Sequence, residues 1–201
     1  MNASASGHEQ ARPEIWLIRH GETEWSLSGQ HTGRTDIPLT PRGHEQARML
    51  APHLAAQRFD RVLTSPMSRA IDTCREAGLG AQAEQEPDLS EWNYGIYEGR
   101  TTKAISESVP GWSVWNSPIP EGESLEQIEA RARALIGRLL APGGRIALFS
   151  HAHFLRVFAG CWIGDSAALG AHLFLDTASI SILGFDHESR AIRQWNTRCA
   201  P

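Results

Sequence analysis

The 201-residue sequence has few cysteines, no long apolar run and no concentration of charge of one sign. Its three cysteines, Cys74, Cys161 and Cys199, form no C-x-x-C pair, which argues against a disulfide framework and is typical of a reducing compartment. Because it has neither a membrane-spanning apolar stretch nor the apolar core of a signal peptide, we predict a cytoplasmic protein with no membrane partner. The nineteen Lys and Arg are scattered and the net charge is −4, which argues against a nucleic-acid partner.

What is present is the composition of an ordinary globular chain, 41% hydrophobic and 21% charged. Residues 1–13 are small and polar and end at Pro13, so we predict a flexible N-terminal tail followed by a single domain over 14–201. The sequence leaves the oligomeric state open, a homodimer included.

Short apolar runs alternate with helical patterns along the chain. Residues 15–18, 61–64 and 146–149 are typical of strands buried on both faces, and two further strands are expected at 178–185 and 191–195. Thr40-Pro41 and Ser65-Pro66 both have the pattern of an N-cap followed by a first-turn proline, which predicts helices to about Gln57 and Ala77. Ser124 and Gln127 have capping-box spacing ahead of another helix, and 154–163 predicts a further one.

This order of elements predicts an α/β fold, a three-layer α/β/α sandwich around a mostly parallel sheet. Ligands of such sheets bind beyond the carboxyl ends of the strands. The polar residues that follow the first three strands, at 19–21, 65–69 and 150–153, are therefore expected at one edge of the sheet. Residues 79–123 are irregular and rich in aromatics, and we expect them to form a lid or a pocket wall.

The residues at this edge suit a phosphate monoester. Arg19 and Arg69 supply permanently charged forks that match phosphate oxygens, and Arg69 is expected in the first turn of a helix, where an anion is also favoured. A neutral His20 has a lone pair that can attack phosphorus, and Gly21 leaves room for the anion. His151 can donate to the phosphoryl oxygens.

The leaving oxygen needs a proton, and Glu91 is the candidate donor. It lies next to Trp92 among apolar and aromatic residues, and partial burial favours the protonated form of a carboxyl group. The same group can later take a proton from the attacking water.

The chain resembles the histidine phosphatase superfamily, which includes cofactor-dependent phosphoglycerate mutases and fructose-2,6-bisphosphatases. The resemblance covers Ile15 to Ile182 and consists of LIRHGETEW, LTPRG, SPMSRAIDT, LSEWNYGIYEG, PEGES and SHAHFLR in their expected order. It implies a phosphoglycerate mutase-like fold, His20 as nucleophile, Arg19, Arg69 and His151 as phosphate pocket, Glu91 as proton donor, and neither a metal nor a cofactor.

Within the superfamily, GQHTGRTDIPLT and EWNYGIYEG are most similar to the branch of the yeast sedoheptulose-1,7-bisphosphatase and related small bacterial phosphatases. Two residues depart from the common pattern. Ser26 stands where mutases commonly carry Asn, and it retains a hydroxyl that can bind substrate. Ala152 follows His151 where Gly is usual, and its methyl group narrows the pocket or reflects tolerant backbone geometry.

Other residues have two interpretations each. His31 and Arg34, with Arg100 and Lys103, are candidates for binding a second phosphate or sugar hydroxyls, or else are ordinary solvated side chains. The pair His151 and His153 has metal-ligand spacing, but no suitably placed Asp or Cys completes a set. The aromatic residues of the same region either wall a substrate cavity or fill a satellite core: Trp25, Trp92, Tyr94, Trp112 and Trp115.

The sequence therefore predicts a metal-independent phosphatase that hydrolyses a small phosphorylated metabolite, with a sugar phosphate expected, through a phosphohistidine on His20. One alternative is a cofactor-dependent phosphoglycerate mutase. It is disfavoured because the resemblance associates mutases with a longer insertion than the roughly 25 residues between Gly99 and Ser124. The other alternative is a non-catalytic protein that binds a phosphorylated ligand, which loss of the nucleophile or proton donor would indicate; neither is lost.

Overall fold

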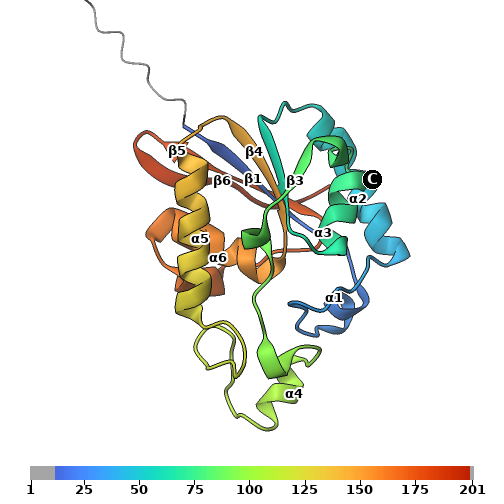
Figure 1. The fold of residues 1–201 in the computed structure, drawn as a ribbon, viewed down its shortest axis with the longest axis vertical. Coiled ribbons are helices and arrows are strands. Elements are labelled where there is room, and N and C mark those ends of the chain that lie inside the picture. The colour runs from blue at the N-terminus through green and yellow to red at the C-terminus, as the bar shows by residue number, and fades with distance from the viewer. Residues whose placement is uncertain (1–11, 200–201) are drawn as a thin grey trace, which may run out of the picture.

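A six-stranded sheet lies at the centre of the computed structural model, which describes residues 12–199 (Figure 1). The strands are β1 (Glu14–Arg19), β2 (Arg61–Thr64), β3 (Ala83–Gln85), β4 (Arg145–Ser150), β5 (Ser179–Asp186) and β6 (Ser189–Arg198). Their order is β3-β2-β4-β1-β5-β6. The first four strands in this order are parallel to one another, β5 is antiparallel to β1, and β6 is antiparallel to β5. The predicted mostly parallel sheet is confirmed. Residues 1–11 of the predicted tail lie outside the described part of the chain.

Helices cover both faces of the sheet and make the three layers that the sequence predicts. The side chains of β1 alternate between the two cores. Trp16 and Ile18 pack with residues of α2 (Pro41–Ala55) and α3 (Ser68–Glu76). Ile15 and Leu17 pack with residues of α5 (Leu125–Leu140) and α6 (Ala152–Gly164) on the opposite face. Because both faces are covered, the central strands are continuous apolar runs.

The two expected cap-plus-proline helix starts have different outcomes. Thr40 caps α2, and its hydroxyl accepts the amide of Gly43 at 2.9 Å. The expected start at Ser65 is wrong, because α3 begins at Ser68 without a side-chain bond from its own N-cap residue. The amide of Ser68 instead donates to the carboxylate of Asp36 at 2.9 Å, so a distant loop caps this helix.

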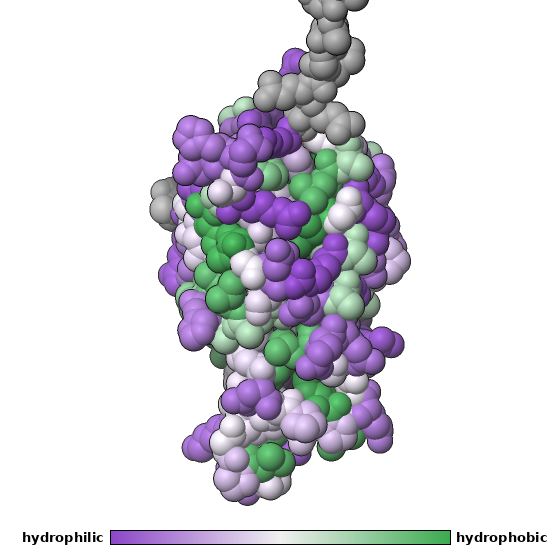
Figure 2. All heavy atoms as spheres, turned by 90° about the vertical axis from the view of Figure 1, so that its left-hand side faces the viewer, coloured by the Kyte–Doolittle hydropathy of each residue, from purple (hydrophilic) through white to green (hydrophobic). Residues whose placement is uncertain are grey.

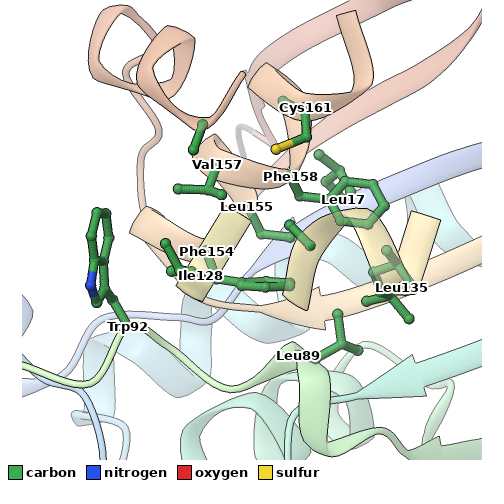
Figure 3. Close-up of a cluster of buried hydrophobic side chains, with 14 of the residues drawn as sticks. Leu17, Leu89, Trp92, Ile128, Leu135, Phe154, Leu155, Val157, Phe158 and Cys161 are labelled. Carbon is green, nitrogen blue, oxygen red and sulfur yellow. The ribbon is translucent and has the colours of Figure 1, made fainter. Parts of the chain in front are cut away.

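Helix α5 follows the prediction closely. Ser124 and Gln127 form the capping box, and one face is buried through Ile128, Ala132, Leu135, Ile136 and Leu139. This face belongs to the larger core cluster, which extends along α6 to Trp92 (Figure 3). The core therefore reaches the segment that carries Glu91.

The irregular region 79–123 contains short elements that the sequence did not predict, β3 and α4 (Thr102–Ser106), and a further short helix, α1 (Glu24–Ser28), lies in the loop after β1. The part with α4 extends beyond the sheet in Figure 1 and makes the narrow end of the molecule in Figure 2. On the face in Figure 2, apolar patches are interrupted by polar side chains. Within residues 12–199, the helices are all too short or too polar to cross a membrane.

Candidate active site

A cavity of about 310 Å³ opens where β1 ends. Arg19 and His20 enter it from the end of β1, and Ala152 and His153 enter from the start of α6, after β4. This is the sheet edge at which the sequence predicts a site. The other lining residues come from 25–32 and from the irregular region: Trp25, Ser26, Gly29, Gln30, His31, Thr32, Glu91, Tyr94, Thr102, Ser113, Val114 and Trp115.

The hydrogen bond of His20 determines its tautomer. Nδ1 lies 2.7 Å from the carbonyl oxygen of Gly21, and because a carbonyl only accepts, Nδ1 carries the proton. Burial, with the charges of Arg69 and Arg19, lowers the pKa of His20 well below its usual value. His20 is thus a neutral imidazole with its lone pair on Nε2, the state that a nucleophile requires.

Arg19 has an unused donor beside His20. Its Nη1 donates to the carbonyl of Leu175 at 2.6 Å, whereas Nε is buried and has no hydrogen-bond partner among the described residues. Burial lowers the pKa of the guanidinium, but arginine starts so high that it keeps its charge. The guanidinium is a permanent cation on a residue that lines the cavity, and this is suited to an anion.

His151 is the N-cap residue of α6 and is fully buried. Its Nδ1 accepts the Nε–H of Arg69 at 3.1 Å. A neutral His151 therefore has its proton on Nε2, which donates to the hydroxyl of Ser65 at 2.7 Å. The rings of His20 and His151 are 5.1 Å apart, so the predicted cluster of Arg19, His20, Arg69 and His151 does converge.

Arg69 differs from the expectation of an open phosphate ligand. Each of its nitrogens donates to protein, Nε to His151, and Nη1 and Nη2 to the carbonyls of Thr35, Thr32 and Gly33. Neither Arg69 nor His151 is among the residues that line the cavity. In this conformation Arg69 acts on the site through its charge, and direct contact of either residue with phosphate stays a prediction.

Glu91 is buried, with its carboxyl group against the start of α6. Oε1 accepts the amides of Trp92 and Phe154 at 2.9 and 2.8 Å, and Oε2 accepts that of His153 at 3.0 Å. Burial raises the pKa of Glu91, although the three amides and the charge of Arg69 oppose it. The direction agrees with the protonated form that the sequence reasoning expects. Oε2 accepts only one amide, so it is the oxygen that can carry the proton.

Gly21 is needed for a reason other than the predicted one. A Cβ at this position would lie 2.4 Å from the carbonyl oxygen of Gly43, at the start of α2. Its amide donates to the hydroxyl of Thr73 in α3 at 3.0 Å. The glycine therefore lets the turn after β1 pack on α2 and α3, and it does not line the cavity.

Three of the predicted substrate-binding residues do line the cavity: Ser26, His31 and Ala152. The hydroxyl of Ser26 is engaged in the capping box of α1, where it donates to the carbonyl of Thr23 at 2.9 Å. Burial lowers the pKa of His31 to about 4, so this imidazole is neutral. Its Nε2 lies 3.2 Å from the hydroxyl of Thr102.

Arg34 and Arg100 are not brought to this cavity. Arg34 is exposed and lines a second hollow with Glu91, Glu123 and Arg131, and His20 does not line that hollow. Arg100 donates to the carbonyl of Ala104 at 2.8 Å and stacks on the ring of Tyr97. The structure thus gives neither arginine a place beside His20.

Some of the lining residues were not singled out as substrate contacts from the sequence. Gln30, Thr32, Thr102 and Ser113 supply polar atoms, and they stand in loops or, for Thr102, at the start of α4, with no pattern that signals a site. Of the candidate aromatics, Trp25, Tyr94 and Trp115 line the cavity, whereas Trp92 and Trp112 belong to the core. The hydroxyl of Tyr94 lies 2.7 Å from Nδ1 of His153, so His153 orients a neighbour. Residues 12–199 contain no cluster of His, Cys, Asp and Glu suited to a metal.

Known proteins are similar to this chain in fold and in sequence. Residues 15–198 match the model of the histidine phosphatase superfamily (branch 1). The chain is 42% identical over 182 residues to an acid phosphatase of Mycobacterium tuberculosis, with 89% of each chain covered. It is 34% identical over 184 residues to the sedoheptulose 1,7-bisphosphatase of Saccharomyces cerevisiae, covering 76% of this chain and 68% of that protein. The solved structure of a Mycobacterium tuberculosis open-reading-frame product superposes with a TM-score of 0.88 at 37% identity, over 93% of this chain and 98% of that one.

The chain therefore belongs to the histidine phosphatase superfamily. Within it, the relatives named as phosphatases identify the protein as a hydrolytic phosphatase.

Proposed function

We propose that the enzyme hydrolyses phosphate monoesters through a phosphohistidine on His20. The observation that carries the proposal is the bond from Nδ1–H of His20 to the carbonyl of Gly21. It leaves the lone pair on Nε2 of a side chain that lines the cavity. Arg19, which lines the same cavity, holds the phosphoryl oxygens next to it, and the buried Arg69 adds positive charge near His20.

The reaction has two steps, phosphorylation of His20 and hydrolysis of the phosphohistidine. Nε2 of His20 attacks phosphorus, the bond to the ester oxygen breaks, and that oxygen keeps the electron pair and takes the proton of Glu91. Water then attacks the phosphohistidine and gives its proton to Glu91 as the N–P bond breaks. Glu91 returns to its protonated form, and inorganic phosphate leaves with the nitrogen lone pair restored.

The cavity supports a small sugar monophosphate as substrate. Trp25, Tyr94 and Trp115 line it together with the hydroxyl-bearing side chains of Thr102 and Ser113, a combination suited to a polyol. Arg19 is the one Lys or Arg among the described residues that line it, and His31 is neutral. A second phosphate has no cation to bind there, so we propose a monophosphate rather than the bisphosphate suggested by the yeast relative's name.

The first experiment measures phosphate release from p-nitrophenyl phosphate in the presence of EDTA. Wild type should turn over, and His20→Ala should not. Brief reaction with ³²P-labelled substrate followed by a quench should leave label on wild type that is lost in acid and retained in alkali, as a phosphoramidate requires. An inactive wild type would instead support the non-catalytic binding alternative.

A panel of substrates tests the rest of the proposal. Sugar monophosphates should be hydrolysed with higher kcat/KM than ketose bisphosphates; the opposite order would contradict our reading of the cavity. The mutase alternative is tested with 3-phosphoglycerate, with and without 2,3-bisphosphoglycerate. Isomerisation faster than phosphate release would overturn the proposed hydrolysis.

A further inference from the structure

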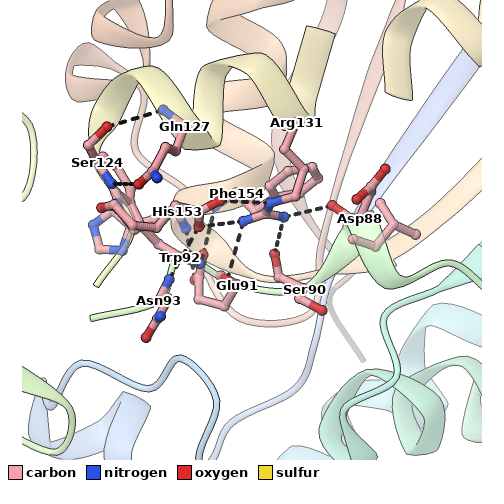
Figure 4. A network of polar contacts seen from close by, with 12 residues as sticks. Asp88, Ser90, Glu91, Trp92, Asn93, Ser124, Gln127, Arg131, His153 and Phe154 are labelled. Carbon is pink, nitrogen blue, oxygen red and sulfur yellow. Dashed lines mark hydrogen bonds and ion pairs between the residues drawn. The ribbon is translucent and has the colours of Figure 1, made fainter. Parts of the chain in front are cut away.

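Arg131 of α5 holds the backbone at Glu91 and just before it (Figure 4). Its Nη1 donates to the carbonyls of Asp88 and Ser90 at 2.7 and 2.8 Å, and Nη2 donates to the carbonyl of Glu91 at 3.4 Å. The side chain is 16% exposed. One guanidinium thus donates to three carbonyls of the stretch that runs from the 3₁₀ helix Pro87–Leu89 to Glu91.

Glu123 completes the arrangement from the other side. Its carboxylate accepts hydrogen bonds from both Nε and Nη2 of Arg131, at 2.9 and 2.8 Å, which makes a two-point ion pair. Its backbone carbonyl accepts the indole N–H of Trp92 at 2.7 Å, and its amide donates to the carbonyl of Asn93 at 2.9 Å. The residues just after Glu91 are therefore tied to the same ion pair.

The guanidinium also contacts the helix that holds the carboxyl group of Glu91. It lies over the ring of Phe154, 4.6 Å from the centroid, and the amide of Phe154 donates to Glu91. Arg131 thus fixes the segment of Glu91 against α6, the element whose first turn binds the carboxyl group.

We propose that Arg131, paired with Glu123, is a positioning residue that keeps the Glu91 carboxyl group within reach of the leaving oxygen. This inference rests on the role of Glu91 as proton donor in the proposed function. A displacement of about 1 Å can cost on the order of 100-fold in rate, so loss of the two-point contact should impair proton transfer selectively. Lysine cannot replace the fork, because an ammonium group is a point charge.

The test compares two leaving groups by kcat/KM, which covers the steps up to phosphorylation of His20. An alkyl phosphate needs the proton of Glu91, whereas p-nitrophenolate is a stable anion that leaves without it. Arg131→Met should lower kcat/KM for the alkyl phosphate by roughly 10–100-fold and for p-nitrophenyl phosphate by only about 3-fold. Arg131→Lys should show the same selectivity, and Glu123→Gln a weaker one.

Arg138→Met is the matched control. Arg138 lies on the same helix and binds the carboxylates of Glu86 and Asp88, but it touches none of the carbonyls around Glu91. Its ratio of kcat/KM for the two substrates should equal that of wild type. If Arg131→Met does not fold, Arg131→Lys and Glu123→Gln are judged by the same ratio.

The double variant Glu91→Gln/Arg131→Met separates this inference from the proposed function. If Arg131 acts through Glu91, the second substitution should add no further selective loss to Glu91→Gln. Equal losses for both substrates in folded Arg131 variants would overturn the positioning role and leave the proposed function intact. If Glu91→Gln itself affected both substrates equally, the proton-donor role of Glu91 would fail instead.

Discussion

Nδ1 of His151 accepts the Nε–H of Arg69 at 3.1 Å, and this bond decides which nitrogen of His151 carries a proton. Because an arginine only donates, the proton lies on Nε2 and is directed at Ser65, 2.7 Å away. Both nitrogens of this histidine are thus engaged with protein. The buried pair of Arg69 and His151 lies next to His20, and the positive charge of Arg69 favours the neutral form of His20.

Removing the hydroxyl of Ser65 should destabilise the fold. Ser65→Ala leaves the Nε2–H of buried His151 without an acceptor, which typically costs about 1–3 kcal/mol in the free energy of unfolding. Urea unfolding of Ser65→Ala and wild type measures this change in the free energy of unfolding. Ser68→Ala, which removes an exposed hydroxyl bound to Asp36, should cost less than about 0.5 kcal/mol. Equal stability of Ser65→Ala and wild type would refute the assigned tautomer.

The rate should favour mildly acidic pH. Burial and the charges of Arg69 and Arg19 lower the pKa of His20, so it stays a neutral nucleophile as pH falls. Burial raises the pKa of Glu91, so it keeps its proton above the usual range of a glutamic acid. For an alkyl phosphate, kcat/KM should therefore fall as pH rises through the raised pKa of Glu91.

Glu91→Gln checks the origin of that decline. The ionisation of the substrate is common to both enzymes, so the difference between the two pH profiles isolates the carboxyl group. The variant should be slower and should lose the part of the alkaline decline that Glu91 causes. If the two profiles have the same shape, another group sets the alkaline limb.

His31 should make stability fall in acid. The unfolded chain binds a proton at this residue near pH 6.5, whereas burial lowers the pKa of His31 in the folded protein to about 4. The contribution of His31 to the free energy of unfolding is therefore full above pH 6.5 and is lost as pH falls from 6.5 to about 4. Between about pH 7 and pH 5 the loss is about 2 kcal/mol.

Urea unfolding at these two pH values tests the prediction with His31→Gln. The variant should show a smaller drop in unfolding free energy than wild type, because glutamine does not titrate. His187→Gln is the matched control, since His187 is 94% exposed and should leave the drop unchanged. An identical drop in wild type and His31→Gln would show that His31 is not buried as a neutral ring.

Two glycine-to-alanine substitutions should have opposite effects. At Gly21 a Cβ meets the carbonyl oxygen of Gly43 at 2.4 Å, so Gly21→Ala must displace the turn after β1 and lower both stability and activity. At Gly137, on the exposed side of α5, a Cβ meets nothing within 4 Å. Gly137→Ala should raise the unfolding free energy by about 0.5–1 kcal/mol. Thermal melts and turnover of both variants provide the measurement.

Much of the fold could be predicted because it depends on local patterns. Each of these patterns, the apolar runs of β1, β2 and β4 and the capping box of α5, is formed by residues within a few positions of one another. Arg19, His20 and Glu91 could be singled out because each stands inside a short motif of the family. The short elements α1, β3 and α4 were missed, because packing rather than strong periodicity stabilises segments of three to five residues.

The sequence by itself determined the layers, the edge of the sheet at which the site lies, and the presence of Arg19, His20 and Glu91 there, since periodicity and motifs are properties of neighbouring residues. Only the tertiary structure decided how those residues are bonded. Ser65 meets His151 across 86 positions, and Arg131 meets the carbonyl of Glu91 across 40. Ser65-Pro66 resembles Thr40-Pro41 locally, yet its hydroxyl has a distant partner and caps no helix. Which hydrogen bond a side chain makes depends on what folding brings beside it, and this has no signature in the adjacent sequence.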